Sequence, residues 1–347
     1  MIPYIDLRAR QSMYMEELKK SVCAVLDSGQ YIGGEHVGLI ESAMADLFGV
    51  RYGVAVGNGT DALTLALQVA GVRAGMEVVI PAFSFFATIG AVLRLRATPV
   101  IVDVREDRPL MDTSKLFERI GSNTAAIVPV HLFGDFVSVS FDGCPIVDDA
   151  SQALNLQRAR FNGHIAALSF YPTKVLGAMG DAGMVLTPHE DTAQSVRQLA
   201  NHGYVHGRSF ERICGHSGYN SRMDAIQAVG LRVSLRYLEQ AIAKRRTIAH
   251  RYDEAFAGAA LKRDDDSAIP TYNITHPERD RVQRELAEDG IGTKIYYPYT
   301  LDQLPVFRGE SAPNAHRFSK ELLALPCHEG LSEEEISYII DKVSKRL

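Results

Sequence analysis

The sequence predicts an α/β fold: a large first domain with a mostly parallel sheet, followed by a smaller α+β domain. Two observations lead to this prediction. Short β-branched runs alternate with helical patterns from about residue 50 to residue 187. After residue 218 the alternation gives way to long charged helical patterns. In a chain of 347 residues we therefore expect domains of residues 1–230 and 231–347.

Seven short apolar runs are the expected strands of the sheet. Runs of this length, bounded by turn residues, are typical of buried strands. They span residues 53–57, 77–82, 98–104, 125–134, 144–150, 166–172 and 182–187. Helical segments separate the first four, as in 60–72, where Leu63 and Leu67 share one stripe.

The link at 135–143 is shorter than the dozen or more residues that a parallel crossover usually needs. We therefore expect an irregular connection that changes only the outside of the first domain. Further along, apolar residues recur every three to four positions over 223–256, which predicts one long charged helix between the two domains. Helices are also expected at 278–290 and 332–347.

Composition excludes several classes of function. The net charge is -5 and no block of Lys and Arg is present, which argues against nucleic-acid binding. The cysteines have no metal-ligand spacing, so we expect no metal and four reduced, mostly buried thiols: Cys23, Cys144, Cys214 and Cys327. Without a signal peptide or an 18-residue apolar run, we expect a cytoplasmic protein that does not bind membranes.

The motif VGNGTDAL at 56–63 is a candidate phosphate site. A strand ends in glycine and a helix begins with Asn58 or Thr60 as its cap. Free backbone N–H groups and the positive end of the helix dipole then meet at one point, where an anion binds favourably. An ordinary capped turn remains the alternative, because the G-K-[ST] sequence of a nucleotide P-loop is absent.

The motif PIVDDASQA at 145–153 places Asp148 and Asp149 at the end of a buried strand. The carboxyl ends of strands in an open α/β sheet are where ligands bind. Capping of the next helix would explain the same residues without a ligand. The pattern leaves both functions open.

Lys174 is isolated between two apolar runs in LSFYPTKVLGAMGDAGMVL, residues 168–186. Burial disfavours the ammonium form and lowers a lysine pKa, and a neutral amine is the form that attacks a carbonyl. A lysine that extends to water would be the structural alternative. A phosphate site, a buried aspartate and a lysine on successive strands are together the groups that pyridoxal 5'-phosphate (PLP) requires for its phosphate, its pyridine nitrogen and its aldehyde.

Six ordered motifs carry a resemblance to a known family. The motifs are NGTDAL, PAFSFFAT, VHLFG, DDASQA, SFYPTKVLGAMGDAG and GYNSRMDAIQA. They resemble the DegT/DnrJ/EryC1/StrS family of PLP-dependent sugar aminotransferases over nearly the whole chain. The resemblance implies the type I (aspartate aminotransferase) fold and a homodimer with active sites at the subunit interface.

The resemblance also implies roles for individual residues. Lys174 takes the place of the lysine that carries PLP covalently, Asp149 that of the partner of the pyridine nitrogen, and Phe85 that of the aromatic side chain stacked on the ring. The other implied cofactor contacts are Gln152 to the ring hydroxyl, Gly59, Thr60 and Ser169 to the phosphate, and Asn220 from the neighbouring subunit. Arg222 and Tyr296 are the candidate substrate contacts, although Arg222 also fits a surface ion pair and Tyr296 stands where many members have histidine.

By the same resemblance, the chain moves an amino group from an amino acid, expected to be L-glutamate, to a nucleotide-linked keto sugar, with pyridoxamine phosphate (PMP) formed on the way. GYNSRMD is similar to the branch that aminates a 3-keto-6-deoxyhexose or a 3-keto-N-acetylhexosamine on dTDP or UDP. Such sugars enter polysaccharides, including lipopolysaccharide O-antigen, and antibiotics.

Four other functions are alternatives for this sequence. They are a 4-keto nucleotide-sugar aminotransferase, a dehydratase of the same fold, a non-catalytic regulatory or binding protein, and a dinucleotide-dependent dehydrogenase. The dehydratases have histidine in place of Lys174, and a regulatory relative would be expected to lose that lysine first. The dehydrogenase would need a G-x-G-x-x-G motif after the first strand, which the sequence lacks.

Overall fold

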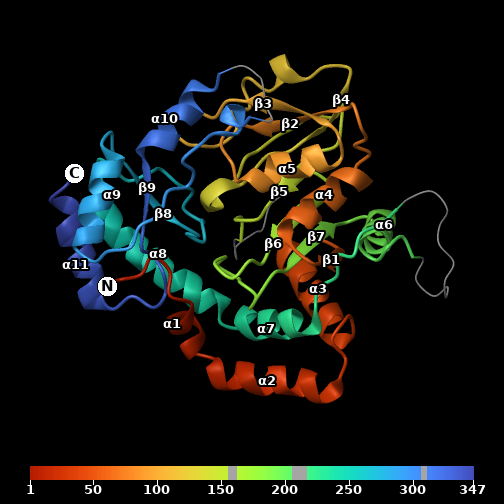
Figure 1. Cartoon of the computed structure of the whole chain (residues 1–347), viewed down its shortest axis with the longest axis horizontal. Coiled ribbons are helices and arrows are strands. Elements are labelled where there is room, and N and C mark those ends of the chain that lie inside the picture. The colour runs from red at the N-terminus through yellow and green to blue at the C-terminus, as the bar shows by residue number, and fades with distance from the viewer. Residues whose placement is uncertain (155–161, 205–216, 306–310) are drawn as a thin grey trace.

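A computed structural model describes residues 1–154, 162–204, 217–305 and 311–347 (Figure 1). The strands are β1 Tyr52–Val56, β2 Glu77–Pro81, β3 Thr98–Val102, β4 Thr124–Ile127, β5 Val147–Asp149, β6 Ile165–Ser169, β7 Gly183–Thr187, β8 Tyr272–Thr275 and β9 Leu322–Leu325. The α-helices are α1 Leu7–Ser12, α2 Met15–Ser28, α3 Glu35–Phe48, α4 Gly59–Val69, α5 Phe86–Arg94, α6 Glu190–Ala200, α7 Ala225–Leu235, α8 Leu238–Ala255, α9 Arg279–Glu288, α10 Pro313–Glu321 and α11 Glu333–Ser344. Short 3-10 helices are η1 Phe117–Arg119, η2 Leu132–Gly134 and η3 Leu301–Gln303.

The seven predicted strands form the main sheet, as expected. Two hydrogen-bonded groups have the orders β3-β2-β4 and β5-β6-β7-β1. Parallel bridges from Ile127 to Ile146 and from Val130 to Asp149 join β4 to β5. Only β7 runs antiparallel to its neighbours among the described strands of this sheet. The predicted mostly parallel sheet is therefore confirmed.

Helices cover both faces of this sheet. Alternate residues of β6 point to opposite faces, as the strand period requires. Ala167 packs in one apolar cluster with Leu63 of α4, whereas Ala166 and Leu168 pack in another with Ile40 of α3. Because both faces are covered, the strands are apolar throughout rather than alternating.

The predicted single helix over 223–256 is two helices, α7 and α8, which meet at an angle in Figure 1. The Ser234 hydroxyl donates to the Gly230 carbonyl at 3.0 Å, a bond within the helix that tends to bend it. The Tyr237 N–H then donates to the carbonyl of Ser234, three residues back, at 3.0 Å. The last turn of α7 is therefore tightened and α8 starts in a new direction.

The C-terminal part is α+β, as predicted. Strands β8 and β9 pair antiparallel, and Figure 1 shows α9 and α11 beside them. A separate apolar cluster includes Tyr252, Ile274 and Ile339. The N-terminus joins this part, because Ile2 pairs with Ile291. The domain boundary expected at residue 230 stays a prediction.

Two smaller expectations need correction. The 135–143 link contains no helix or strand, but it is not confined to the outside of the large domain. Asp135 is buried and accepts from the Asp264 N–H at 2.9 Å, and the Phe136 N–H donates to Asp264 Oδ2 at 3.0 Å. The link therefore contacts the C-terminal part.

The cysteines were expected to be mostly buried. Instead Cys23 is exposed, Cys144 is partly buried and Cys327 is buried, all three with free thiols, and Cys214 lies outside the described residues. Cys23 is exposed because it falls on the outer face of the amphipathic helix α2. Among the described helices, none has the length and hydropathy that a membrane span needs.

Candidate active site

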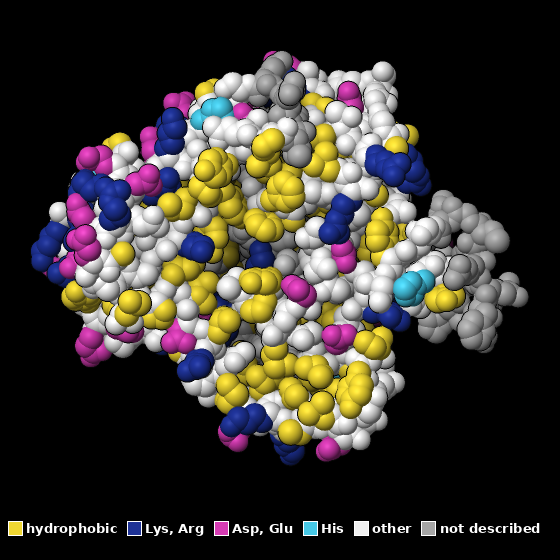
Figure 2. Space-filling model, viewed as in Figure 1, with side chains coloured by type: hydrophobic (Ala, Val, Ile, Leu, Met, Phe, Trp, Pro, Cys, Tyr) yellow, Lys and Arg dark blue, Asp and Glu magenta, His cyan; other side chains and the backbone are white. Residues whose placement is uncertain are grey.

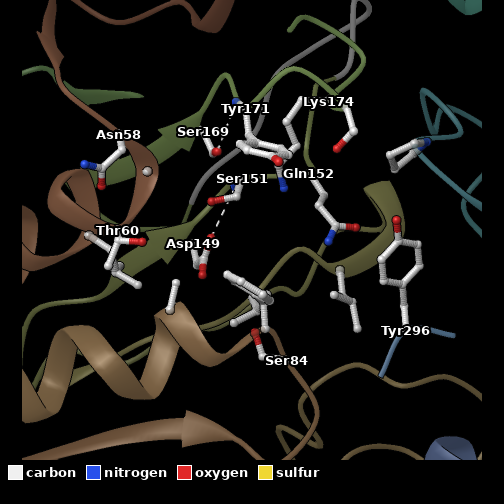
Figure 3. Close-up of a pocket in the computed structure, with 18 of the residues that line it drawn as sticks. Asn58, Thr60, Ser84, Asp149, Ser151, Gln152, Ser169, Tyr171, Lys174 and Tyr296 are labelled. Atoms are coloured by element: carbon white, nitrogen blue, oxygen red, sulfur yellow. Dashed lines mark hydrogen bonds between the residues drawn. The ribbon is translucent and has the colours of Figure 1, made fainter. Parts of the chain in front are cut away.

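One cavity of about 840 Å³ gathers most of the predicted site residues. Its wall is built from loops that follow β1, β2, β4, β5 and β6, at the carboxyl ends of parallel strands, and from residues 294–297 of the C-terminal part. Eight of the predicted residues line it: Gly59, Thr60, Phe85, Asp149, Gln152, Ser169, Lys174 and Tyr296. In Figure 3, Thr60, Asp149, Gln152 and Tyr296 follow one another across the cavity.

The N-terminus of α4 is a candidate anion site in this cavity. Asn58 is the cap, and its side chain accepts from the Asp61 N–H at 2.8 Å. The N–H groups of Gly59 and Thr60, in the first turn, have no partner within the helix. A Cβ at Gly59 would lie 2.5 Å from Ser169 Cβ, so only glycine lets β6 approach the helix end this closely. The helix end is therefore open to an anion, and the phosphate role of Gly59, Thr60 and Ser169 stays a prediction.

Asp61 supports this helix end, although the sequence did not single it out. Its carboxylate accepts from Ser221 Oγ at 2.8 Å and from Arg94 Nη1 at 2.7 Å. Arg94 compensates the negative charge of Asp61 beside the anion site. The Ser221 contact also fixes the segment that carries Asn220.

The two aspartates of the DDA motif have different environments. Asp148 is fully buried and faces away from the cavity, where it pairs with His131 Nε2 at 3.0 Å and accepts from the N–H groups of Asn162 and Gly163. Asp149 faces the cavity. Its Oδ2 accepts from Thr88 Oγ1 at 3.0 Å and its Oδ1 from the Ser151 N–H at 3.2 Å.

Asp148 is therefore structural, and Asp149 is left to face a ligand. Strand alternation explains the difference, since neighbouring residues point to opposite faces. Thr88, which holds Asp149, was not predicted. The only signal in the sequence was its place in the PAFSFFAT motif.

Lys174 follows β6 and lies half-buried at the cavity wall. Burial lowers the pKa of its amine below the ordinary value, and the Asp149 carboxylate opposes this shift. The alternative of a lysine extended to bulk water does not apply. Instead, the amine shares one cavity with a carboxylate, as a PLP site requires.

Aromatic and amide side chains complete the wall. Phe85 is 58% exposed although it is apolar, and its ring lies 6.0 Å from the Tyr297 ring. Gln152 accepts from the Phe133 N–H at 2.9 Å and donates to Tyr297 Oη at 3.4 Å. Burial, and then the charge of Asp149, raise the pKa of Tyr297, so its phenol stays protonated. Tyr297 was not predicted, although it stands beside Tyr296 in the YYPY segment.

Asn220 and Arg222 are not brought to this cavity. Both are exposed, and Arg222 Nη2 donates to Asn220 Oδ1 at 2.7 Å while Nη1 donates to Asn201 Oδ1 at 3.2 Å. Their roles stay predictions. Tyr296 does line the cavity, with its ring 6.0 Å from that of Tyr4.

The residues present fit PLP. The α4 N-terminus suits its phosphate, the Asp149 carboxylate its pyridine nitrogen, the Phe85 face its ring and the Lys174 amine its aldehyde. The fold and the site thus define a PLP-dependent transferase of the type I fold. The comparisons specify which one: the chain belongs to the DegT/DnrJ/EryC1/StrS aminotransferase family, whose model matches residues 13–344.

Named relatives and a solved structure cover almost the whole chain. One relative, 34% identical over 365 residues (100% of this chain, 98% of the relative), is the UDP-N-acetyl-3-dehydro-α-D-glucosamine 3-aminotransferase of Acidithiobacillus ferrooxidans. Another, 33% identical over 371 residues (99% and 98%), is the pleiotropic regulatory protein of Geobacillus stearothermophilus. The crystal structure of NtdA from Bacillus subtilis with bound PMP superposes with a TM-score of 0.91 at 26% identity, covering 99% of this chain and 84% of that chain.

Proposed function

We propose that this chain transfers the amino group of L-glutamate to the C3 carbonyl of a nucleotide-linked sugar. The observation that carries the proposal is the half-buried Lys174, in one cavity with the buried Asp149 and the free N–H groups of α4. The relative from A. ferrooxidans, which acts on a 3-keto UDP-sugar, supports the position of the carbonyl.

PLP, when bound, supplies the aldehyde that takes up the amino group and a ring that withdraws electrons. The chain supplies the proton chemistry. Desolvation disfavours the protonated form of the Lys174 amine, so Nζ can take a proton from the carbon that carries the amino group and return it. The Asp149 carboxylate would hold a proton on the pyridine nitrogen, and Thr88 keeps this carboxylate in place. The phenol of Tyr297 stays protonated at the cavity wall, and its Oη accepts from the Gln152 amide.

A cation at the cavity wall favours a negatively charged substrate as the acceptor of the amino group. Arg94 and Lys294 line the cavity besides Lys174. Arg94 is already paired with Asp61, whereas Lys294 is exposed and forms no ion pair with any residue that the structure describes. The diphosphate of a nucleotide sugar is the group that this free ammonium suits.

We further propose that the active enzyme is a homodimer in which Asn220 reaches the partner's cavity. Figure 2 shows hydrophobic side chains around the central hollow and over the lower region, where Figure 1 places α2, α3 and α7. Exposed apolar residues belong to the cavity rim and to the α2–α3 region: Phe85, Phe86, Tyr171, Leu26, Tyr31, Ile32 and Leu39. A patch of this kind is typical of an interface, and a second copy related by twofold symmetry would cover it.

Mixing two inactive variants tests the shared site. Lys174→Ala and Asn220→Ala homodimers should each be impaired, whereas a mixed dimer has one cavity with both changes and one with neither. Co-expression should therefore restore about a quarter of the wild-type activity, because half of the dimers are mixed and each has one intact site. No recovery, or a monomer in sedimentation analysis, would contradict the dimer proposal.

The transfer itself is tested by absorbance and product analysis. L-glutamate should shift the visible absorbance of the PLP-loaded protein, and a 3-keto nucleotide sugar should restore it and gain an amino group seen by mass spectrometry. Recovery only with 4-keto sugars would move the assignment to the other branch. A protein that binds PLP but never turns over would favour a regulatory role, which the name of the G. stearothermophilus relative suggests for that protein.

A further inference from the structure

A buried arginine binds the main chain of the turn that carries Lys174. Arg10 of α1 is only 7% exposed, and its Nη1 donates to the carbonyl oxygens of Lys174 at 2.8 Å and of Pro172 at 3.1 Å. The turn is short, and inside it the Lys174 N–H donates to the Tyr171 carbonyl at 2.8 Å. Arg10 therefore binds the peptide units 172–173 and 174–175, on either side of the Thr173–Lys174 peptide, and so holds the Lys174 backbone itself.

Glu329 of the C-terminal part holds Arg10 in turn, and Arg245 holds Glu329. Arg10 Nε lies 2.6 Å from Glu329 Oε1, and Glu329 Oε2 lies 2.8 Å from Arg245 Nη2. All three side chains are buried. Desolvation would raise the pKa of Glu329, but Arg245 and Arg10 bring it below its usual range, so the carboxylate stays ionised between them.

The same network reaches the part of the cavity wall that the C-terminal part supplies. Arg245 Nη1 donates to the Ile269 carbonyl at 3.0 Å, and the next two residues, Pro270 and Thr271, line the cavity. Arg10, Glu329 and Arg245 thus connect the lysine turn with the cavity wall supplied by the C-terminal part. The Arg10 contacts span more than 160 residues of sequence.

Stability alone does not account for three buried charges at this place. Desolvation of ions is unfavourable, and apolar side chains of similar volume often hold segments together as well or better. Apolar side chains cannot, however, bind two carbonyl oxygens in fixed directions, whereas the planar guanidinium can. We therefore expect the three charges to fix the direction of the main chain at Lys174.

We infer that Arg10 is a positioning residue: by binding the carbonyls of Pro172 and Lys174 it directs the lysine side chain at the cofactor, with Glu329 and Arg245 keeping Arg10 in place. The inference rests on the proposed function in that it takes Lys174 to be the reactive amine. Arg10 itself does not line the cavity.

The test compares Arg10→Met with Arg279→Met. Arg279 is a matched control, since it is equally buried and donates to two carbonyls, of Leu322 at 2.8 Å and Ser319 at 3.1 Å, but lies within the C-terminal part. The first measurement is reductive trapping of Lys174 by PLP and borohydride, followed by peptide mass spectrometry. Arg10→Met should slow trapping about 100-fold, the loss typical of a misplaced reacting group, while Arg279→Met should trap at the wild-type rate.

Further measurements separate positioning from folding. Arg10→Met should lower kcat about as much as trapping, with the KM for the sugar little changed, and should shift the pH titration of the bound cofactor's visible absorbance. Arg10→Lys, which keeps the charge, should recover part of each loss. Wild-type trapping and turnover in a folded Arg10→Met protein would overturn the inference.

Should Arg10→Met not fold, Glu329→Gln gives the second test, since it leaves Arg10 but removes its charge partner. It should slow trapping and speed amide hydrogen exchange at Thr173 and Lys174 relative to Arg279→Met. Unchanged values in both measurements would equally overturn the inference. A wild-type protein that traps Lys174 but aminates no sugar would instead refute the proposed function and leave the role of Arg10 standing.

Discussion

Replacing Thr88 with valine removes one hydrogen bond from Asp149 without creating a cavity. Thr88 is fully buried, its Oγ1 donates to Asp149 Oδ2 at 3.0 Å, and it lies 2.7 Å from Ser84 Oγ. A hydrogen bond to a charged group contributes about 1.5–3 kcal/mol and a neutral one about 1 kcal/mol. Valine has nearly the shape of threonine, so packing is retained. We therefore expect Thr88→Val to lower the free energy of unfolding of the cofactor-free protein by about 2–4 kcal/mol.

Urea denaturation at neutral pH measures this loss, and Thr64→Val is the matched control. Thr64 is also buried, but its hydroxyl donates to the Thr60 carbonyl of its own helix at 2.8 Å, so its removal should cost about 1 kcal/mol or less. Because Asp149 is less firmly held in Thr88→Val, PLP affinity should also fall at least about tenfold, which corresponds to about 1.4 kcal/mol. Equal losses of stability in the two variants, with PLP affinity retained in both, would refute the assignment of Thr88 to Asp149.

Three further predictions concern the same molecule. Gly59→Ala would place a Cβ 2.5 Å from Ser169 Cβ, so α4 must move away from β6; we expect a loss of about 1–3 kcal/mol in urea denaturation and weaker PLP binding by titration. Burial lowers the pKa of Lys174 below 10.5, so the unfolded lysine binds its proton more tightly. The cofactor-free protein should therefore gain stability as pH rises towards 10.5, and Lys174→Met should remove this gain. Burial raises the pKa of Asp135 to about 7 from 3.8, so its ionisation destabilises the fold as pH rises through that range. Asp135→Asn should be more stable at pH 8 by up to about 4 kcal/mol, the free-energy equivalent of that difference.

A specific result would contradict each of these three predictions. Gly38→Ala, in α3 with nothing within 4 Å of the added Cβ, should not destabilise the protein, and PLP affinity unchanged in Gly59→Ala would contradict the close approach. If the increase in stability at alkaline pH persists in Lys174→Met, it must come from the titration of another residue. An Asp135→Asn protein that is less stable than wild type at pH 8 would mean that the Arg108 ion pair outweighs burial.

The strands and the central site groups were predictable because their signals are local. A run such as 77–82 is apolar and bounded by turn residues wherever it is read, and the DDA and PTK motifs each lie within a few positions of a strand end. Whether Asp148 or Asp149 faces the ligand was not decidable without the resemblance, since either parity of the strand fits the pattern.

The parts that sequence reasoning missed depend on distant contacts. Thr88 matters only because α5 places it against a carboxylate 61 residues away. The break between α7 and α8 lies where the Ser234 hydroxyl donates to the Gly230 carbonyl, a contact that the spacing of apolar residues does not show. Arg10 stands in an N-terminal segment whose composition gives no sign of the turn that it binds.

Asp149 lies where β4 meets β5, the junction between the two halves of the main sheet, so its backbone amide reports on the opening of this junction. Its N–H donates to the Pro129 carbonyl at 2.9 Å, and its own carbonyl accepts from the His131 N–H at 3.1 Å. Any fluctuation that parts β4 from β5 must break these bonds and carry the carboxylate with it. The hydrogen-exchange rate of the Asp149 amide therefore reports how often β4 and β5 separate beneath the cavity. A ligand that binds the Asp149 carboxylate should lower this exchange rate.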